Sequence, residues 1–276
     1  MKSYNVLDLF SGIGGFTLGL QQAGIKHNWL GYSEIDPYAK KVFRRHYGKA
    51  EDLGSVTNVR AEDLPRIDIV TFGSPCQDFS NAGKRGGLEA NRSGLFYEAM
   101  RIVRTTRPKY FIFENVKGIF SSKGGQDFRI VLQEIADSGY DGQWELLDSR
   151  YVLPQSRERM YFVGHIRGER RPEIFPIKDI HRWNNEEQLQ VKTAAEEEWD
   201  LQYSSSGWRR KGYTGRVDTT KFNMRRLTPI EYERLQGFPD GWTEGNSDTQ
   251  RYKQLGNSVT VPIVKLVGER IKEYLE

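Results

Sequence analysis

The sequence predicts an α/β protein built on a doubly wound, mostly parallel sheet, with a small irregular second domain. Two observations predict the sheet. Short apolar runs alternate with segments of helical periodicity, as in repeated β-α-β units. Turns rich in glycine or polar residues follow the apolar runs. In an open α/β sheet these turns lie at the carboxyl ends of the strands, which form the active edge where ligands bind. The second domain is indicated by a third observation, because the alternation becomes faint between Arg167 and Asn223.

Composition narrows the classes to which the protein can belong. A chain of 276 residues can bury one large core and hold an appended piece. Its apolar runs are too short to cross a membrane, and the first residues enter a strand at once, so we expect a cytoplasmic, nucleoid-associated protein. The single cysteine and four histidines offer neither a disulfide nor a ligand cluster, and no metal is expected.

The first half of the chain follows the β-α pattern. Gly24 and Gly139 each close a helix, and Ser93 is the expected cap of another. We expect strands at 5–10, 28–32, 51–53, 67–72 and 110–113. We expect helices after the turn 11–15, from Pro37, from 93 and around 128–135, so that helices and strands alternate along the chain.

The second half contains the irregular part. Two strands between Gly142 and His165 flank the segment 154–159, and Thr228 opens a helix through a capping box. Residues 254–259 are expected to form a turn before a last helix at 262–275. Within the irregular part, arginines are interleaved with aromatic residues, a mixture that suits phosphates and base edges.

The turn after the first strand favours a nucleoside-bearing ligand. Gly12 and Gly14 fit a dinucleotide fingerprint, but Thr17 stands where its third glycine is required, so a pyrophosphate is disfavoured. Glu34 follows the second strand, where a carboxylate binds the hydroxyls of a ribose. Asp36 precedes a proline and is interpreted as a helix cap. Asp52 is either an acceptor for the amine of an adenine or a solvated loop acid.

Cys76 stands at the centre of the sequence pattern. It lies in the stretch 73–80, just beyond an apolar strand, and Glu114 ends the next apolar strand. A lone cysteine can be a small buried hydrophobe, but a thiol and a carboxylate at neighbouring strand ends also form a catalytic pair. Arg157 and Arg159 share one face and either partner Glu114 or form a solvated edge. Residues 77–91 are expected to form a mobile loop that closes over a substrate.

Taken together, these segments resemble the DNA cytosine-5 methyltransferases of the bacterial and phage type. The resemblance lies in blocks that occur in the family's order, at 8–15, 73–80, 113–116, 154–159, 226–239 and 254–259. It covers nearly all of the chain except 167–223. Two departures are Ser74, where the family commonly has a bulky residue, and a recognition domain that is shorter than usual, which implies a brief target site.

The resemblance implies a Rossmann-like methyltransferase fold that binds S-adenosyl-L-methionine. A catalytic and cofactor-binding domain would span 1–166 and be completed by 254–276, and a target-recognition domain would span 167–253. The cofactor would lie over the strand ends, near Phe10, Gly12, Ile13, Gly14, Gly15, Glu34, Ile35, Asp52, Leu53, Pro75, Leu95, Asn257 and Ser258.

The resemblance also implies a mechanism and partners. The Cys76 thiolate would add to carbon 6 of a flipped-out cytosine, while Glu114, held by Arg157 or Arg159, shares a proton with N3. Double-stranded DNA is the expected substrate, bound by a monomer with a companion restriction endonuclease. Contacts to DNA are expected from Gln77, Ser80, Lys84, Arg85, Arg209, Arg210 and Arg216. The alternatives are a tRNA cytosine-5 methyltransferase and a catalytically inactive DNA-binding relative.

Overall fold

The computed structural model contains a seven-stranded sheet in the order β3-β2-β1-β4-β5-β7-β6, which confirms the predicted α/β class. It describes residues 2–74, 94–169, 172–177, 203–204, 207–208 and 227–275. Neighbouring strands from β3 to β5 are parallel, whereas β7 is antiparallel to both β5 and β6. The strands are β1 (Ser3–Leu9), β2 (Lys26–Ser33), β3 (Glu51–Asp52), β4 (Ile69–Gly73), β5 (Tyr110–Val116), β6 (Tyr140–Asp148) and β7 (Glu158–Ile166), with a separate hairpin of β8 (Tyr203–Ser204) and β9 (Gly207–Trp208).

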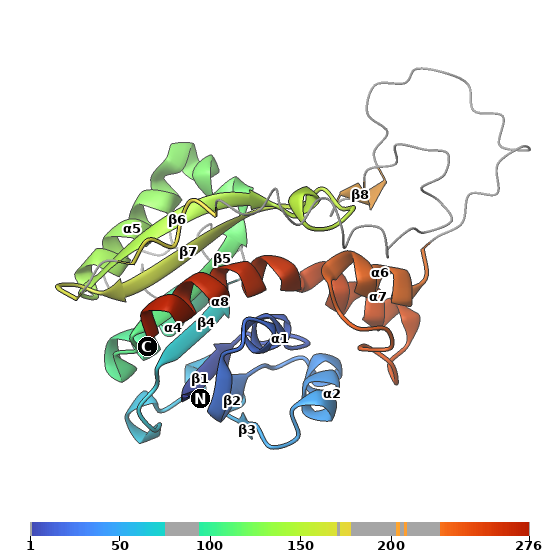
Figure 1. Cartoon of the computed structure of the whole chain (residues 1–276), viewed down its shortest axis with the longest axis horizontal. Coiled ribbons are helices and arrows are strands. Elements are labelled where there is room, and N and C mark those ends of the chain that lie inside the picture. The colour runs from blue at the N-terminus through green and yellow to red at the C-terminus, as the bar shows by residue number, and fades with distance from the viewer. Residues whose placement is uncertain are drawn as a thin grey trace, which may run out of the picture.

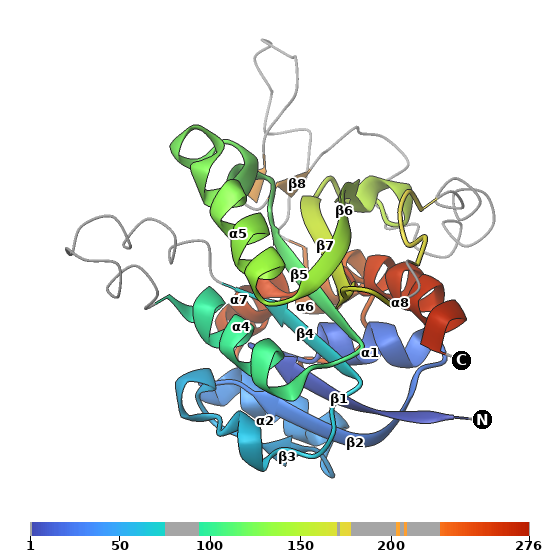
Figure 2. The ribbon, with the colours of Figure 1, turned by 90° about the vertical axis from the view of Figure 1, so that its left-hand side faces the viewer.

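Helices cover both faces of the sheet. The α-helices are α1 (Gly15–Gln22), α2 (Pro37–His46), α4 (Leu95–Thr106), α5 (Gln126–Asp137), α6 (Pro229–Gln236), α7 (Asp248–Asn257) and α8 (Val261–Leu275). Short 3-10 helices occur at η1 (Val56–Asn58), η2 (Ala61–Asp63), η4 (Lys117–Phe120), η5 (Ser122–Gly125) and η6 (Ser149–Tyr151). Figures 1 and 2 show α1 and α8 on one face, and α4 and α5 on the other.

The side chains of the strands alternate between two cores, as the period of a strand requires. Val6 of β1 packs with α1 and α8, whereas the next residue, Leu7, packs with α4. The same alternation places Ile112 of β5 in the first core and Phe111 in the second. Because both faces are buried, the central strands read as continuous apolar runs, which is why the sequence predicted them.

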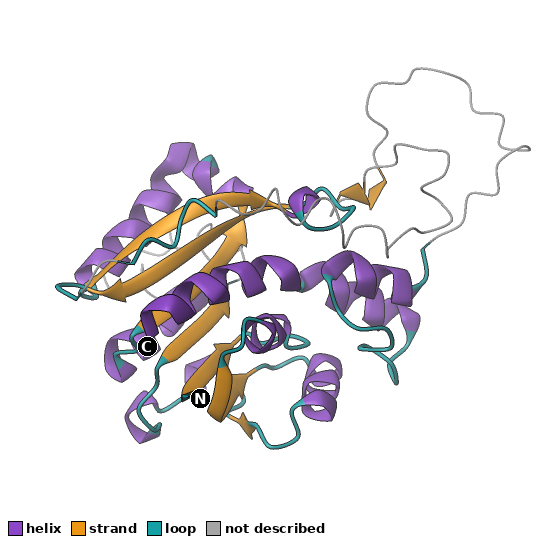
Figure 3. Ribbon diagram, viewed as in Figure 1, coloured by secondary structure: helices purple, strands orange, loops and turns teal. Residues whose placement is uncertain are grey.

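A third core joins the C-terminal helices to the N-terminal ones. Leu235 of α6 and Leu255 of α7 pack with Leu18 of α1 and Val42 of α2. In Figure 3, α6 and α7 lie together beyond the N-terminal end of α8. Residues 172–177 also contact the sheet, with Ile174 and Ile177 in the first core. The domain boundary drawn at Arg167 stays a prediction.

Two expectations about local structure were wrong. Residues 254–257 are not part of a turn but form the last turn of α7, and only Ser258 and its successors connect α7 to α8. The cap of α4 is Gly94, not Ser93. The capping interpretation of Asp36 is confirmed, because its carboxylate accepts hydrogen bonds from the Tyr38 and Ala39 amides.

Candidate active site

The turn between β1 and α1 has an unusual backbone. Phe10, Gly12 and Gly14 have positive φ angles of 53°, 54° and 87°. Glycine adopts such angles without steric cost, but a phenylalanine does not, and strained residues of this kind gather at functional sites. The strain at Phe10 makes this turn a candidate for ligand binding, as the sequence predicted.

The Glu34 carboxylate joins this turn to the end of β2. One of its oxygens accepts a hydrogen bond from the Gly12 amide (2.8 Å), and the other accepts from the Ile35 (2.7 Å) and Asp36 (2.8 Å) amides. Ile35 is 73% exposed, which is unusual for a large apolar side chain. A carboxylate and an exposed apolar side chain thus lie next to each other at the active edge of the sheet.

Asp52 lies on the neighbouring strand and is engaged by cations. It pairs with Lys40 (2.8 Å) and Arg44, and it accepts from the Gly54 amide (3.0 Å). Burial alone would raise the pKa of Asp52, but the hydrogen bonds from Lys40, Gly54 and Arg44 lower it to about 2. Asp52 is therefore an ionised acceptor that is already bound by two cations. Leu53 beside it is half-buried against the second core.

The segment between α7 and α8 approaches the start of α1. A Cβ atom on Gly15 would lie 2.8 Å from Ser258 Oγ, so only glycine allows this approach. Asn257 is exposed and Ser258 is buried. Ile13 is directed elsewhere: its side chain is buried in the third core, and its carbonyl accepts from Trp242 Nε1 (2.9 Å). Leu95 begins α4 and is half-buried.

Glu114 lies at the end of β5 and forms an ion pair with Arg159. The Arg159 Nε atom is 3.2 Å from Glu114 Oε1, and both side chains are largely buried. Gly73 of β4 stands opposite Glu114, and a Cβ atom there would lie 3.2 Å from Glu114 Oε2. Burial raises the pKa of Glu114, and the charges of Arg159 and Arg157 oppose that rise. The pKa of Glu114 therefore lies above its ordinary value.

Arg157 contacts a different part of the molecule. Its Nη1 atom donates to the Gly256 carbonyl (3.1 Å) and its Nη2 atom to the Ser258 carbonyl (2.7 Å). Of the two predicted arginines, Arg159 therefore lies against Glu114, while Arg157 binds the backbone between α7 and α8. Neither forms the solvated edge that the sequence left open, because Arg157 is buried and the Arg159 side chain is 13% exposed.

Tyr161 was missed by the sequence reasoning. It stands opposite Glu114 in the β5-β7 pairing and is buried. Its hydroxyl lies close to the backbone of Thr260, immediately before α8. Burial raises the pKa of Tyr161, and the nearby charge of Glu114 adds to the rise. The only available signal was its spacing of two residues from Arg159 on a predicted strand.

Several predicted site residues lie outside the described part of the chain. They are Pro75, Cys76, Gln77, Ser80, Lys84, Arg85, Arg209, Arg210 and Arg216. Among the described residues, no group of His, Cys, Asp or Glu side chains could hold a metal ion. No helix in those same ranges is long and apolar enough to span a bilayer.

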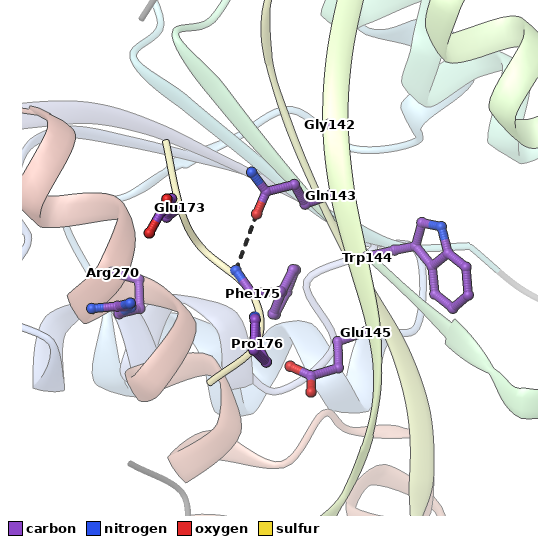
Figure 4. A pocket seen from close by; sticks show the side chains of 8 residues that line it. All are labelled: Gly142, Gln143, Trp144, Glu145, Glu173, Phe175, Pro176 and Arg270. Carbon is purple, nitrogen blue, oxygen red and sulfur yellow. Dashed lines mark hydrogen bonds between the residues drawn. The ribbon is translucent and has the colours of Figure 1, made fainter. Parts of the chain in front are cut away.

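A cavity of about 930 Å³ lies away from these residues, at the edge strand β6. Its lining includes Gln143 and Glu145 of β6, Phe175, and Arg270 of α8 (Figure 4). The Gln143 and Glu145 side chains accept hydrogen bonds from backbone amides of residues 174–177. These contacts fasten residues 172–177 to the edge strand, and the cavity contains none of the predicted site residues.

Comparisons with known proteins show the family to which the chain belongs. The chain is 34% identical to the Type II methyltransferase M1.ScrFI of Lactococcus lactis subsp. cremoris, over 99% of this chain and 79% of the relative. It is 31% identical to M.NlaX of Neisseria lactamica, over 99% and 97%. The structure of the S. pombe Dnmt2 methyltransferase is similar with a TM-score of 0.74 and 20% identity, over 99% of each chain, which shows a shared Rossmann-like fold. The family model for C-5 cytosine-specific DNA methylases matches residues 4–210 and 178–273, and the chain therefore belongs to that family.

Proposed function

We propose that this DNA cytosine-5 methyltransferase transfers the methyl group of S-adenosyl-L-methionine to carbon 5 of a cytosine flipped out of a short duplex site. Carbon 5 is a poor nucleophile until a thiolate adds at carbon 6, and Cys76 is the only thiol in the chain. The reacting atoms are buried inside a duplex, so the base must leave the stack at a cost of roughly a few kcal/mol.

The observation that supports this proposal most is the ion pair between Glu114 and Arg159. It lies at the active edge of the sheet, opposite Gly73, and Cys76 is three residues further along the sequence than Gly73. When a thiolate adds to cytosine, negative charge develops towards N3. A carboxyl group that shares a proton with N3 stabilises that charge, and the raised pKa of Glu114 favours the protonated form.

The residues at the strand ends fit S-adenosylmethionine. The turn lacks the third glycine of a pyrophosphate site, and Glu34 offers a carboxylate to a ribose. The exposed Ile35 offers an apolar surface to a purine ring, and the exposed Asn257 lies beside the close approach of Ser258 to Gly15. When bound, the cofactor supplies an electrophilic methyl group. Glu34, Ile35, Asp52, Phe10, Asn257 and Ser258 would hold it.

We assign target recognition to the segment 167–253, whose arginine and aromatic content suits DNA. The chain is 32% identical to an orphan methyltransferase of Bacillus phage SPR, over 92% of this chain and 50% of that relative. The Type II names of the other relatives favour a companion restriction endonuclease over an orphan role.

Bisulfite sequencing of DNA from a host that expresses the protein tests this function. We expect protected cytosines at one short sequence with the wild type, and none with Cys76→Ala. Glu114→Gln should lower the methylation rate by about 10²- to 10⁴-fold, since it removes the group that shares a proton with N3. A tRNA transcript assayed beside the duplex separates the two substrate classes. If folded wild-type protein protects no cytosine in DNA, the proposal is overturned.

A further inference from the structure

Arg157 and Arg159 lie two residues apart, but their side chains have different tasks. Arg159 pairs with Glu114, whereas Arg157 donates to the carbonyls of Gly256 and Ser258. Arg157 is buried, with 7% of its surface exposed, and its hydrogen bond to Ser258 is shielded from water, whereas the bond to Gly256 is only partly buried. One guanidinium group thus binds the backbone on both sides of Asn257.

The bound carbonyls lie at the C-terminal end of α7. Gly256 is in the last turn of that helix, where carbonyl groups lack intrahelical partners and the helix dipole is negative. A guanidinium group suits both features of a helix end, because it donates hydrogen bonds to the unpaired carbonyls and its positive charge complements the negative end of the dipole. Its planar fork also fixes the direction of the two carbonyls relative to each other.

The other side of this segment rests against α1. The Cβ atom that Gly15 lacks would lie 2.8 Å from Ser258 Oγ and 2.8 Å from Val259 Cγ2. The segment 256–258 is therefore held between Arg157 on one side and the first turn of α1 on the other. Asn257, which stands between the two bound carbonyls, is exposed.

The backbone of Arg157 is itself fixed. Its amide donates to Asp148 Oδ1 (3.0 Å), and its carbonyl accepts from the Ser149 amide (3.1 Å). The guanidinium group thus extends from an anchored residue, two positions before the one that pairs with Glu114. A displacement of this anchor would reach both the segment 256–258 and Arg159, which pairs with Glu114.

We propose that Arg157 is a positioning residue that holds the segment 256–258 in the conformation that binds S-adenosylmethionine. This inference rests on the proposed function, in which Asn257 and Ser258 contact the cofactor. It divides the two arginines by role: Arg157 supports cofactor binding through the backbone, and Arg159 supports the chemistry through Glu114.

Arg157→Lys tests the inference, because lysine keeps the charge near Glu114 but loses the two-pronged fork. Calorimetry without DNA should show roughly tenfold weaker binding of S-adenosylmethionine. The KM for the cofactor should rise in parallel, while kcat at saturating cofactor stays within about twofold. Arg157→Gln is measured in the same way, so that the test can be completed even if only one of the two variants folds. Near-ultraviolet circular dichroism checks the fold of each variant.

Two matched variants complete the test. Arg159→Lys should lower kcat and leave cofactor binding within about twofold of the wild type. Arg60→Lys, in an exposed arginine that pairs with Asp63 far from Arg157 in the sequence, should change neither. The inference is overturned if folded Arg157 variants bind the cofactor as the wild type does, or if Arg159→Lys weakens binding equally. If the wild type itself neither binds the cofactor nor methylates DNA, the proposed function falls and the inference with it.

Discussion

At the residue scale, Glu34 has a structural task and a proposed ligand-binding task that can be separated. Its carboxylate accepts three backbone hydrogen bonds at the end of β2, one of them from Gly12, and we assign its remaining lone pairs to a ribose. Removing the side chain should therefore disturb the turn and the ligand together. Replacing it by glutamine keeps the size of the side chain and one acceptor oxygen.

We expect Glu34→Ala to weaken binding of S-adenosylmethionine by roughly ten- to a hundredfold, because hydrogen bonds to a charged group are lost. Glu34→Gln should have a smaller effect. Calorimetry on both variants measures this, with Glu62→Ala at an exposed carboxylate as the control. Unchanged affinity in Glu34→Ala would make Glu34 a structural acid only.

Asp8 is a fully buried carboxyl group on β1, the strand that leads into the turn at 11–15. It accepts hydrogen bonds from the Thr17 (2.7 Å) and Thr71 (2.9 Å) hydroxyls. Burial raises the pKa of Asp8 to about 7, those hydrogen bonds oppose the rise, and the charge of Glu34 adds to it. The folded protein therefore binds this proton more tightly than the unfolded chain does.

This difference predicts a pH dependence of stability. The contribution of Asp8 is fully present below its ordinary pKa of 3.8 and is lost as the pH rises through about 7. Relative to Asp8→Asn, the wild type should lose unfolding free energy between about pH 4 and pH 7 and change little above pH 8. Urea unfolding at several pH values measures this, and Asp63→Asn serves as an exposed control. A difference that does not vary with pH would contradict the assignment.

At the element scale, Glu233 of α6 anchors the chain that follows the helix. It is fully buried and accepts from the Gly241 (2.6 Å) and Thr243 (2.8 Å) amides. It also pairs with Arg251 of α7 (3.1 Å), whose side chain is 12% exposed. A single carboxylate thus joins α6, the loop 239–243 and α7.

Glu233→Ala should lower the free energy of unfolding by about 3–5 kcal/mol, because it leaves two amides without their acceptor and removes the buried carboxylate that pairs with Arg251. Glu231→Ala removes the capping box of the same helix and should cost only about 1 kcal/mol. Urea denaturation compares the two variants. Equal losses would show that Glu233 acts as an ordinary helix residue.

The sequence predicted elements well where apolar periodicity is strong. The central strands and α5 were found because their buried residues recur at regular spacing. The α7 helix was missed because only Gln254 and Leu255 are buried in it, and Gly256-Asn257 has the composition of a turn. The antiparallel direction of β7 also could not be predicted, since a strand pattern contains no direction.

At the scale of the whole molecule, strand order decides which predicted residues meet. Placing β4 beside β5, and β5 beside β7, brings Gly73, Glu114 and Arg159 together from distant parts of the chain. The sequence supplied these residues as candidates. It could not assign Arg157 and Arg159 to different partners, because their alternate spacing predicts one shared face and does not show that the end of α7 packs against Arg157.

The division between chemistry and recognition is also a property of the whole molecule. We expect alanine at Arg209, Arg210 or Arg216 to change where the enzyme methylates, not whether it does. Removing an arginine that reads a guanine edge should cost about 1–3 kcal/mol of binding free energy at one base position. Removing one that binds phosphate should weaken binding to all sequences alike and flatten its salt dependence. Methylation of a randomised duplex library at two salt concentrations distinguishes these outcomes. If none of the three changes either property, the assignment of this segment is withdrawn.

The central claim is that Cys76 attacks a cytosine while Glu114 and Arg159 stabilise the charge that develops. A duplex with 5-fluorocytosine at the target site tests it, because fluorine at carbon 5 cannot leave as a proton does, so the bond between sulfur and carbon 6 persists after methyl transfer. The account predicts a complex with the wild type that survives denaturant and depends on S-adenosylmethionine, and no such complex with Cys76→Ala. The absence of that complex, under conditions in which the same enzyme methylates the unmodified duplex, would contradict it.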